Sequence, residues 1–390
     1  MDEIAGKLEE NVSGKRASIT QVAIASLIGT MIEWYDFYLY GTASALIFNK
    51  LFFPTFSPLA GTLAAFATFW VGFGARPIGG IVFGHFGDRI GRKSMLVLTL
   101  LLMGGATFLI GVMPTYPVIG VWAPFLLVIL RFVQGFAVGG EWGGAVLIAT
   151  EHSPKSWRGF FGSWPQAGAP AGLLLATAMF TLTTLFLTPQ QFELFGWRIP
   201  FLLSFLLIII GIVIRLKVQE TPDFMQVKER HAEAHMPVIE VFRTSGKYVA
   251  LAAGAFLADV TGFYLFSTFV LSYGTTQLGM PRLTILNATL IASAFFFFAI
   301  PAAAALSDLW GRKPVYMAGI ICTAATVFPF FWLFETRSPL LVILAICLSQ
   351  IGLALMHGPR RRSLASYLEH AYATAASRWA INWALSWAEA

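Results

Sequence analysis

Ten long apolar segments dominate this 390-residue sequence, in which 57% of the residues are hydrophobic and 12% are charged. A soluble domain carries about 25% charged residues, whereas a helix that crosses ~30 Å of hydrocarbon needs about 20 apolar ones. The pattern therefore predicts an all-α polytopic membrane protein. Its ten predicted spans are 20–48, 59–84, 94–113, 118–149, 158–187, 199–216, 248–273, 283–306, 314–334 and 338–358.

Most lysines and arginines fall at alternate ends of these segments. They lie in the N-terminal tail and in the loops 85–93, 151–158, 215–247 and 307–313. The intervening loops carry four, which are Lys50, Arg198, Arg282 and Arg337. Because cytoplasmic loops are enriched in Lys and Arg, we expect a multi-pass protein of the inner or plasma membrane with a cytoplasmic N-terminus. The spread of charge over short loops argues against nucleic acid as a partner.

One loop pattern occurs twice, about 220 residues apart. GHFGDRIGRK (84–93) and ALSDLWGRKP (305–314) share the order D-x-x-G-R-K. Secondary transporters are commonly built from such repeats, so the repeat predicts two related halves. The expected organisation is an N-terminal six-helix bundle (1–216), a cytoplasmic linker (217–247), an incomplete C-terminal bundle of four helices (248–358) and an atypical tail (359–390).

Several motifs together resemble the major facilitator superfamily, and within it the metabolite:proton symporter family. They are the loop GHFGDRIGRK with its second-half echo, RFVQGFAVGGEWGG (131–144), EWYDFYLYG, ARPIGG, GSWPQAGAPAG and GWRIPFLLS. The resemblance implies a twelve-helix fold of two bundles around a cavity that opens alternately to each side. About ten of those helices are present here. Members of that family carry α-ketoglutarate, citrate, shikimate, proline or betaine.

The resemblance also implies conformational-switch loops and a charge network. In the superfamily, the loop Asp and the fourth-helix Arg hold the outward-facing state, and Asp88 and Arg131 match those positions. The switch residues expected here are Gly84, Asp88, Arg89, Gly91, Arg92 and Lys93 in the first half and Asp308, Gly311, Arg312 and Lys313 in the second.

Two acids stand in the first apolar segment, within GTMIEWYDFYLYG. Glu33 and Asp36 are three residues apart and therefore share one helical face. An ionisable group inside the membrane costs ~2.5 to 3.5 kcal/mol and marks a functional site by default. Two carboxylates this close cannot both be charged cheaply in a low-dielectric site, so we expect them to couple transport to protons. The alternative is that each acid simply satisfies a buried arginine.

Five further residues are candidates for the substrate cavity. Tyr35 offers a hydroxyl and a flat ring, although tyrosines near helix ends are often interface anchors. Arg76 is suited to bind a carboxylate. Arg131 is expected to pair with Asp88 or a first-helix acid rather than with substrate. Glu141 and Asp259 are acids inside the fourth and seventh spans. For Glu141, ordering of its glycine-rich interface is favoured over substrate binding.

Few other residues in the sequence indicate a binding or catalytic role. His357, near the end of the tenth span, is expected to be solvated. No nucleotide-binding motif is present, and no metal or cofactor site is expected. The sequence after Pro359 contains neither Gly nor Pro, which favours truncation after the tenth helix by a frameshift. The alternative is a genuine interfacial helix, because Trp379, Trp383 and Trp387 recur every four residues.

These observations favour a secondary transporter rather than an enzyme. The expected function is proton-coupled symport of a small organic metabolite, most simply a carboxylate, by a monomer embedded in the lipid bilayer. Two alternatives remain open: a membrane sensor that binds a metabolite without transporting it, and an inactive truncated carrier.

Overall fold

The computed structural model describes residues 19–90, 92–139, 160, 163–217, 254 and 260–358, and within these ranges the regular structure is entirely helical. The all-α prediction is therefore confirmed. The helices of the first half are α2 (Ile19–Ala43), α3 (Asn49–Phe52), α4 (Pro58–Ile90), α5 (Arg92–Val112), α6 (Tyr116–Ile119), α7 (Trp122–Gly139), α10 (Trp164–Phe186), α11 (Pro189–Gln191) and α12 (Arg198–Lys217). Those of the second half are α15 (Val270–Ser272), α16 (Arg282–Trp310), α17 (Arg312–Glu335) and α18 (Pro339–His357).

Four short π-helical segments extend or interrupt these helices. One joins α2 to α3 (Ser44–Phe48) and one precedes α12 (Phe192–Gly196), while two flank α15 (Leu265–Phe269 and Tyr273–Gln277). Each widens the helix locally, a feature common at functional sites.

Six helices in the described residues are long and apolar enough to span a membrane, and a bent pair at Pro189–Val213 makes a seventh if it counts as one span. A helix also occupies the other predicted segments where the structure describes them. In the first of these, α2, two acids and three tyrosines interrupt the apolar run. The apolar part of α5 is short, Val97–Val112. The described residues thus support a multi-pass protein, and the count of ten stays a prediction.

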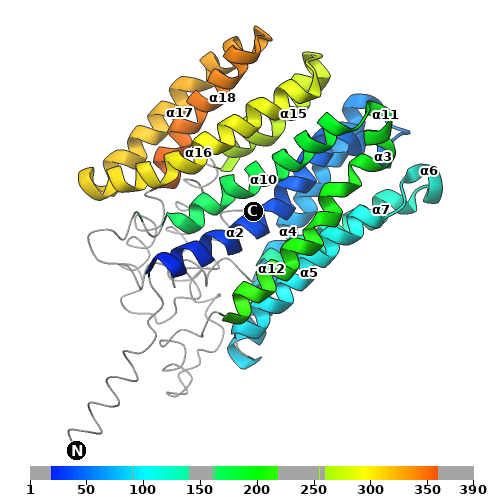
Figure 1. The fold of residues 1–390 in the computed structure, drawn as a ribbon, viewed down its shortest axis with the longest axis horizontal. Helices are drawn as coiled ribbons and strands as arrows, with labels where there is room; N and C mark the ends of the chain where they lie inside the picture. The colour runs from blue at the N-terminus through cyan, green and yellow to red at the C-terminus, as the bar shows by residue number, and fades with distance from the viewer. Residues whose placement is uncertain are drawn as a thin grey trace, which may run out of the picture.

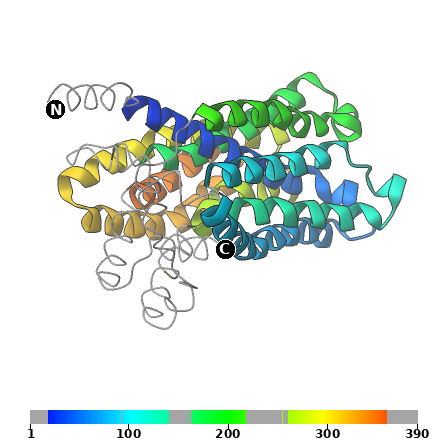
Figure 2. The ribbon, with the colours of Figure 1, turned by 90° about the horizontal axis from the view of Figure 1, so that it is seen from below.

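The helices form two groups joined along α10. Figure 1 shows α16, α17 and α18 on one side of α10 and α2, and α4, α5, α7 and α12 on the other. Helix α10 packs along α2 within the first half and along α16 of the second. Seen at 90° in Figure 2, the helices of both groups run in broadly the same direction. The core at the seam between the groups is rich in aromatic rings, including Phe37, Tyr38, Phe263 and Phe266.

Small residues set the distance between α10 and α2. A Cβ added to Gly172 would lie 2.7 Å from the Tyr35 backbone nitrogen, and one added to Gly168 would lie 2.6 Å from the Thr30 Cβ. These glycines are four residues apart and so share one face of α10. Inside a membrane, helix association depends on such close packing because lipid supplies no hydrophobic drive. Gly168 and Gly172 therefore allow α10 and α2 to pack closely beside the seam.

We expect Gly172→Ala to destabilise the fold, because its Cβ has no room against the backbone of α2. Overpacking of this kind costs about 1–3 kcal/mol. The thermal unfolding midpoint in detergent should fall for Gly172→Ala. It should stay unchanged for Gly105→Ala, because Gly105 has nothing within 4 Å of its added Cβ. Equal midpoints for the two variants would contradict this role of α10.

Candidate functional site

A narrow cavity lies between the two groups of helices. Its volume is about 30 Å³, the space of about one water molecule. Five aromatic side chains form most of its wall: Trp34, Tyr38, Phe73, Phe263 and Tyr264. Trp34 and Tyr38, both on α2, stack with ring centroids 5.2 Å apart. The cavity thus has flat, largely apolar walls contributed by both halves of the chain.

Three polar side chains give this cavity its chemistry. Arg76 comes from α4, Gln166 from α10 and His357 from the end of α18. All three are buried. The Arg76 guanidinium lies 4.7 Å from the Phe73 ring centroid and 4.9 Å from that of Phe37. Because a guanidinium binds carboxylates through paired N–H donors, the arrangement suits a small organic anion.

Arg131 lies deeper than Arg76 and does not line the cavity. It is 1% exposed, and its guanidinium lies 4.2 to 4.5 Å from three ring centroids, those of Phe37, Tyr40 and Phe69. Cation–π contacts of this kind contribute about 2 kcal/mol or more when the cation is desolvated. The Phe37 ring therefore contacts both guanidiniums, one on the cavity side and one behind it.

A chain of polar contacts runs from Arg131 towards the acids of α2. Arg131 Nη1 donates to Gln134 Oε1 (3.1 Å), and Gln134 Nε2 donates to Thr107 Oγ1 (2.7 Å). Thr107 donates to the Met103 carbonyl (3.0 Å) and also contacts the carboxyl of Asp36. Within the described residues, Arg131 Nε and Nη2 and Asp36 Oδ1 have no hydrogen-bond partner. Asp36 and Arg131 are thus linked indirectly, through Thr107 and Gln134.

The two predicted proton-coupling acids are both buried on α2. Glu33 is 7% exposed and Asp36 is 2% exposed. Tyr35, which lies between them, faces away from the cavity, and its hydroxyl donates to the Pro200 carbonyl (2.7 Å). The structure therefore gives Tyr35 a role in fixing α2 to α12. It does not place this tyrosine at the cavity.

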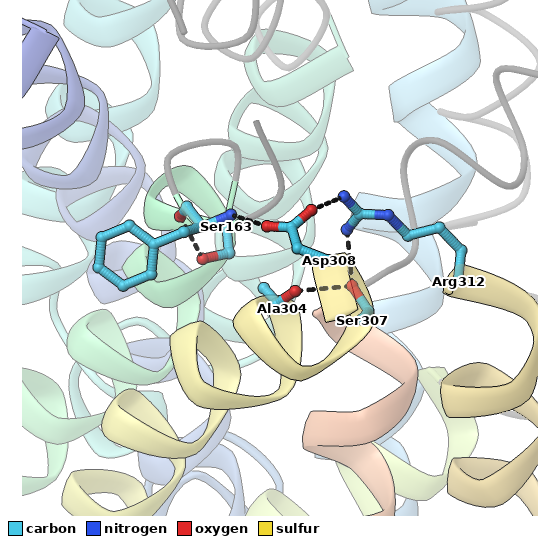
Figure 3. A network of polar contacts seen from close by, with 6 residues as sticks. Ser163, Ala304, Ser307, Asp308 and Arg312 are labelled. Atoms are coloured by element: carbon cyan, nitrogen blue, oxygen red, sulfur yellow. Dashed lines mark hydrogen bonds and ion pairs between the residues drawn. The ribbon is translucent and has the colours of Figure 1, made fainter. Parts of the chain in front are cut away.

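The second-half switch loop connects the two halves at one end of α16, as Figure 3 shows. The Phe160 backbone N–H, which precedes α10, donates to Asp308 Oδ2 (3.1 Å). Asp308 also forms an ion pair with Arg312, whose Nη1 donates to Ser307 Oγ (2.6 Å). Gly311, with φ at +90°, makes the turn between α16 and α17. The carboxylate is therefore held in position to accept from the first half.

A second connection between the halves lies at the other end of α16. Arg282 Nη2 donates to the Leu46 carbonyl in the π-helical segment after α2 (3.4 Å). The guanidinium of Arg282 also lies 4.5 Å from the Phe192 ring centroid. Arg282 and Asp308 are 26 residues apart on one helix, or about 39 Å at 1.5 Å per residue. The halves therefore meet near both ends of α16.

Several predicted residues lie outside what the structure describes. These are Glu141, Asp259 and Gly91, together with the surroundings of Gly84 and the side chains of Asp88, Arg89, Arg92 and Lys93. For Lys313 the structure gives its position in the first turn of α17.

The structure also adds two cavity residues that sequence reasoning missed. His357 was expected to be solvated, and this expectation is wrong, because its side chain is buried among cavity rings. Gln166 lies in the motif GSWPQAGAPAG. A lone amide in a run of small residues was the signal that could have identified it.

Comparisons with known proteins identify transporters as relatives of this chain. The family model for "Sugar (and other) transporter" matches residues 22–246. The shikimate transporter of Escherichia coli K12 is 45% identical over 336 residues, which are 85% of this chain and 76% of that protein. The inner membrane metabolite transport protein YhjE of the same organism is 40% identical, covering 88% and 79%. The proline/betaine transporter of E. coli K12 is 35% identical, covering 80% and 64%.

Solved structures show the same fold. A crystal structure of a D-xylose-proton symporter aligns with a TM-score of 0.67 over 95% of this chain and 89% of that one. A partially occluded inward-open structure of the E. coli xylose transporter XylE also aligns with a TM-score of 0.67. At 19% and 18% identity, these similarities concern the fold alone.

The chain of contacts behind the cavity predicts a measurable stability effect. Gln134→Leu removes the acceptor of Arg131 Nη1 and the donor to Thr107, which leaves buried polar groups unpaired at about 1–3 kcal/mol each. The thermal midpoint should fall markedly for Gln134→Leu. Gln277→Leu, at an exposed position, should leave it within error. A Gln134→Leu protein as stable as wild type would show that this network adds nothing to the fold.

Proposed function

This chain belongs to the sugar (and other) transporter family of the major facilitator superfamily, and we propose that it imports a small organic carboxylate together with a proton. The observation that carries the proposal is the cavity between the two halves, with the Arg76 guanidinium in a wall of aromatic rings. A buried cation recruits an anion, while the flat walls exclude water and favour a compact carbon skeleton. Relatives named for shikimate and for proline or betaine support a small organic solute.

Proton coupling is proposed for Asp36, with Glu33 as its neighbour on the same helix. Asp36 is 2% exposed, and its Oδ1 has no hydrogen-bond partner among the described residues. A protonated Asp36 can donate to Thr107, whereas a bare carboxylate requires Thr107 to turn its hydroxyl hydrogen away from Met103. Thr107 also accepts from Gln134, which in turn accepts from Arg131. The protonation of Asp36 therefore changes the hydrogen bonds that reach Arg131.

The proposed cycle is alternating access between the two halves. The Asp308 contact to Phe160 joins the halves at one end of α16, and the Arg282 contact to Leu46 joins them at the other. A switch between the two states would break these contacts in turn. We place the Asp308 end on the cytoplasmic side, with the N-terminus. The proposed membrane is the bacterial inner membrane, and the proposed bundles are 1–216 and 248–358, joined by 217–247.

We expect Asp36→Asn to abolish uptake of labelled shikimate or a related acid driven by a pH gradient into proteoliposomes. Counterflow driven by preloaded substrate should remain, because binding and reorientation need a neutral side chain at this position rather than a titrating one. Glu335→Gln, which changes an exposed acid at the end of α17, should behave as wild type. Gradient-driven uptake that survives Asp36→Asn would refute coupling through this residue.

Asp308→Ala should open the cytoplasmic end of the cavity, because Phe160 N–H then loses its acceptor and Arg312 its partner. In a background with Cys322→Ser and Cys347→Ser, Ala169→Cys places a thiol in the cavity wall. Its alkylation in inside-out vesicles should be several-fold faster with Asp308→Ala. Arg337→Ala, at the other membrane face, serves as control. An unchanged rate in a folded protein would argue against a closing role for Asp308.

A further inference from the structure

We propose that Glu193 controls how readily the two halves separate at the Arg282 end of α16, because its charge is shared between Lys50 of the first half and Arg282 of the second. The inference rests on the proposed alternating access and names the residues that regulate it at this end. Lys50 lies in α3, Glu193 in the π-helical segment before α12, and Arg282 at the start of α16.

Arg282 is the residue of the second half that reaches across the seam here. Its Nη2 donates to the Leu46 carbonyl (3.4 Å), and its guanidinium lies 4.5 Å from the centroid of the Phe192 ring. A distance of 3.4 Å is long for an N–H···O hydrogen bond, so this bond is weak. The hold of the first half on Arg282 is therefore sensitive to any further charge nearby.

The first half offers the Leu46 carbonyl because the helix changes its bonding at this point. The π-helical segment Ser44–Phe48 ends directly before α3. In a regular α-helix the Lys50 N–H would donate to the Leu46 carbonyl, four residues back. Here the Lys50 N–H donates to Asn49 Oδ1 (2.9 Å). The carbonyl is therefore available to a donor from the second half.

Two neighbouring residues before α12 face in different directions. Phe192 is 1% exposed and packs against the Phe180 ring of α10, with the centroids 6.2 Å apart. Glu193 is turned to the surface, where its Oε1 lies 2.6 Å from Lys50 Nζ. The Glu193 carboxylate also acts electrostatically on the Arg282 guanidinium. One carboxylate thus has a cation from each half beside it.

Two cations that share a carboxylate compete for it. Lys50 and Glu193 belong to the same half, so their ion pair can persist whether the halves are together or apart. The positive charge of Lys50 offsets part of the attraction that Glu193 exerts across the seam. Arg282 alone loses that attraction when the halves separate. Glu193 therefore favours closure at this end, and Lys50 favours opening.

The test measures access to a thiol placed deeper in the seam. A Cβ added to Gly41 of α2 would lie 3.3 Å from the Thr268 Cγ2, so Thr268→Cys places a thiol between the halves. Gly41 precedes Leu46 by five residues along the same helical run. In a background with Cys322→Ser and Cys347→Ser, the thiol reacts with a charged, membrane-impermeant methanethiosulfonate added to right-side-out vesicles. The rate reports opening at the Arg282 end.

Neutralising the two partners of this ion pair should have opposite effects. Glu193→Gln should speed the reaction and Lys50→Ala should slow it, each by about twofold to fivefold, the range expected for an exposed charge pair. Arg282→Ala should speed it at least as much, and in that background neither other change should have an effect. Glu335→Gln removes an exposed acid at the same end of the second half and should leave the rate unchanged.

Thermal midpoints are recorded for every variant, and they should stay close to wild type for Glu193→Gln and Lys50→Ala because both side chains are well exposed, at 40% and 58%. Rate changes in the same direction for these two variants would mean that their ion pair only stabilises the first half, and the inference would fall. Unchanged rates for both would also overturn it.

The outcomes distinguish this inference from the proposed function. Opposite rate changes in a protein that imports no acid would overturn carboxylate import and leave the control by Glu193 standing. Acid import by a protein in which the two variants change the rate equally would leave the proposed function standing and overturn the control by Glu193.

Discussion

The burial of two guanidiniums beside one phenylalanine ring is the constraint around which the first half of this protein is organised. Arg76 and Arg131 both contact Phe37 and are both nearly inaccessible to solvent. A charge inside a membrane costs at least ~2.5 kcal/mol, and ring faces, amide oxygens and hydroxyls offset that cost only if they are held at fixed positions. Close packing of α2 against α10 and of α4 against α7 supplies that rigidity.

This arrangement gives the two arginines different roles. Arg131 is enclosed by three rings and supported by Gln134, so it responds to changes in the contacts that reach Thr107 and Asp36. Arg76 lies at the cavity wall, where we propose that it meets the ligand. Because Phe37 contacts both cations, a change in protonation at Asp36 has a short physical route to the substrate side. The proposed proton coupling would pass through the Phe37 ring on α2.

The sequence predicts the class of this protein well and its cavity poorly, for a definite physical reason. Apolar length and the repeated loop depend on local composition, and both can be read without knowing which helices touch. The positions of Tyr35 and His357 depend on the rotation of α2 and α18 about their axes. Tyr35 turns to Pro200 on α12, and His357 turns inward although it ends a span. No periodicity in a helix that is apolar on all sides reveals that rotation.

A carrier whose halves meet near both ends of α16 raises the question of what makes closure around a ligand favourable. A ligand shifts a conformational equilibrium only by its difference in affinity for the two states. A carboxylate held by Arg76 alone contacts one half and gives little such difference. A ligand that also touches Phe263 or Tyr264 contacts both halves, because these residues line the cavity from the second half. Contacts with both halves would therefore couple binding to reorientation, since a ligand that contacts one half alone can occupy the cavity without favouring its closure.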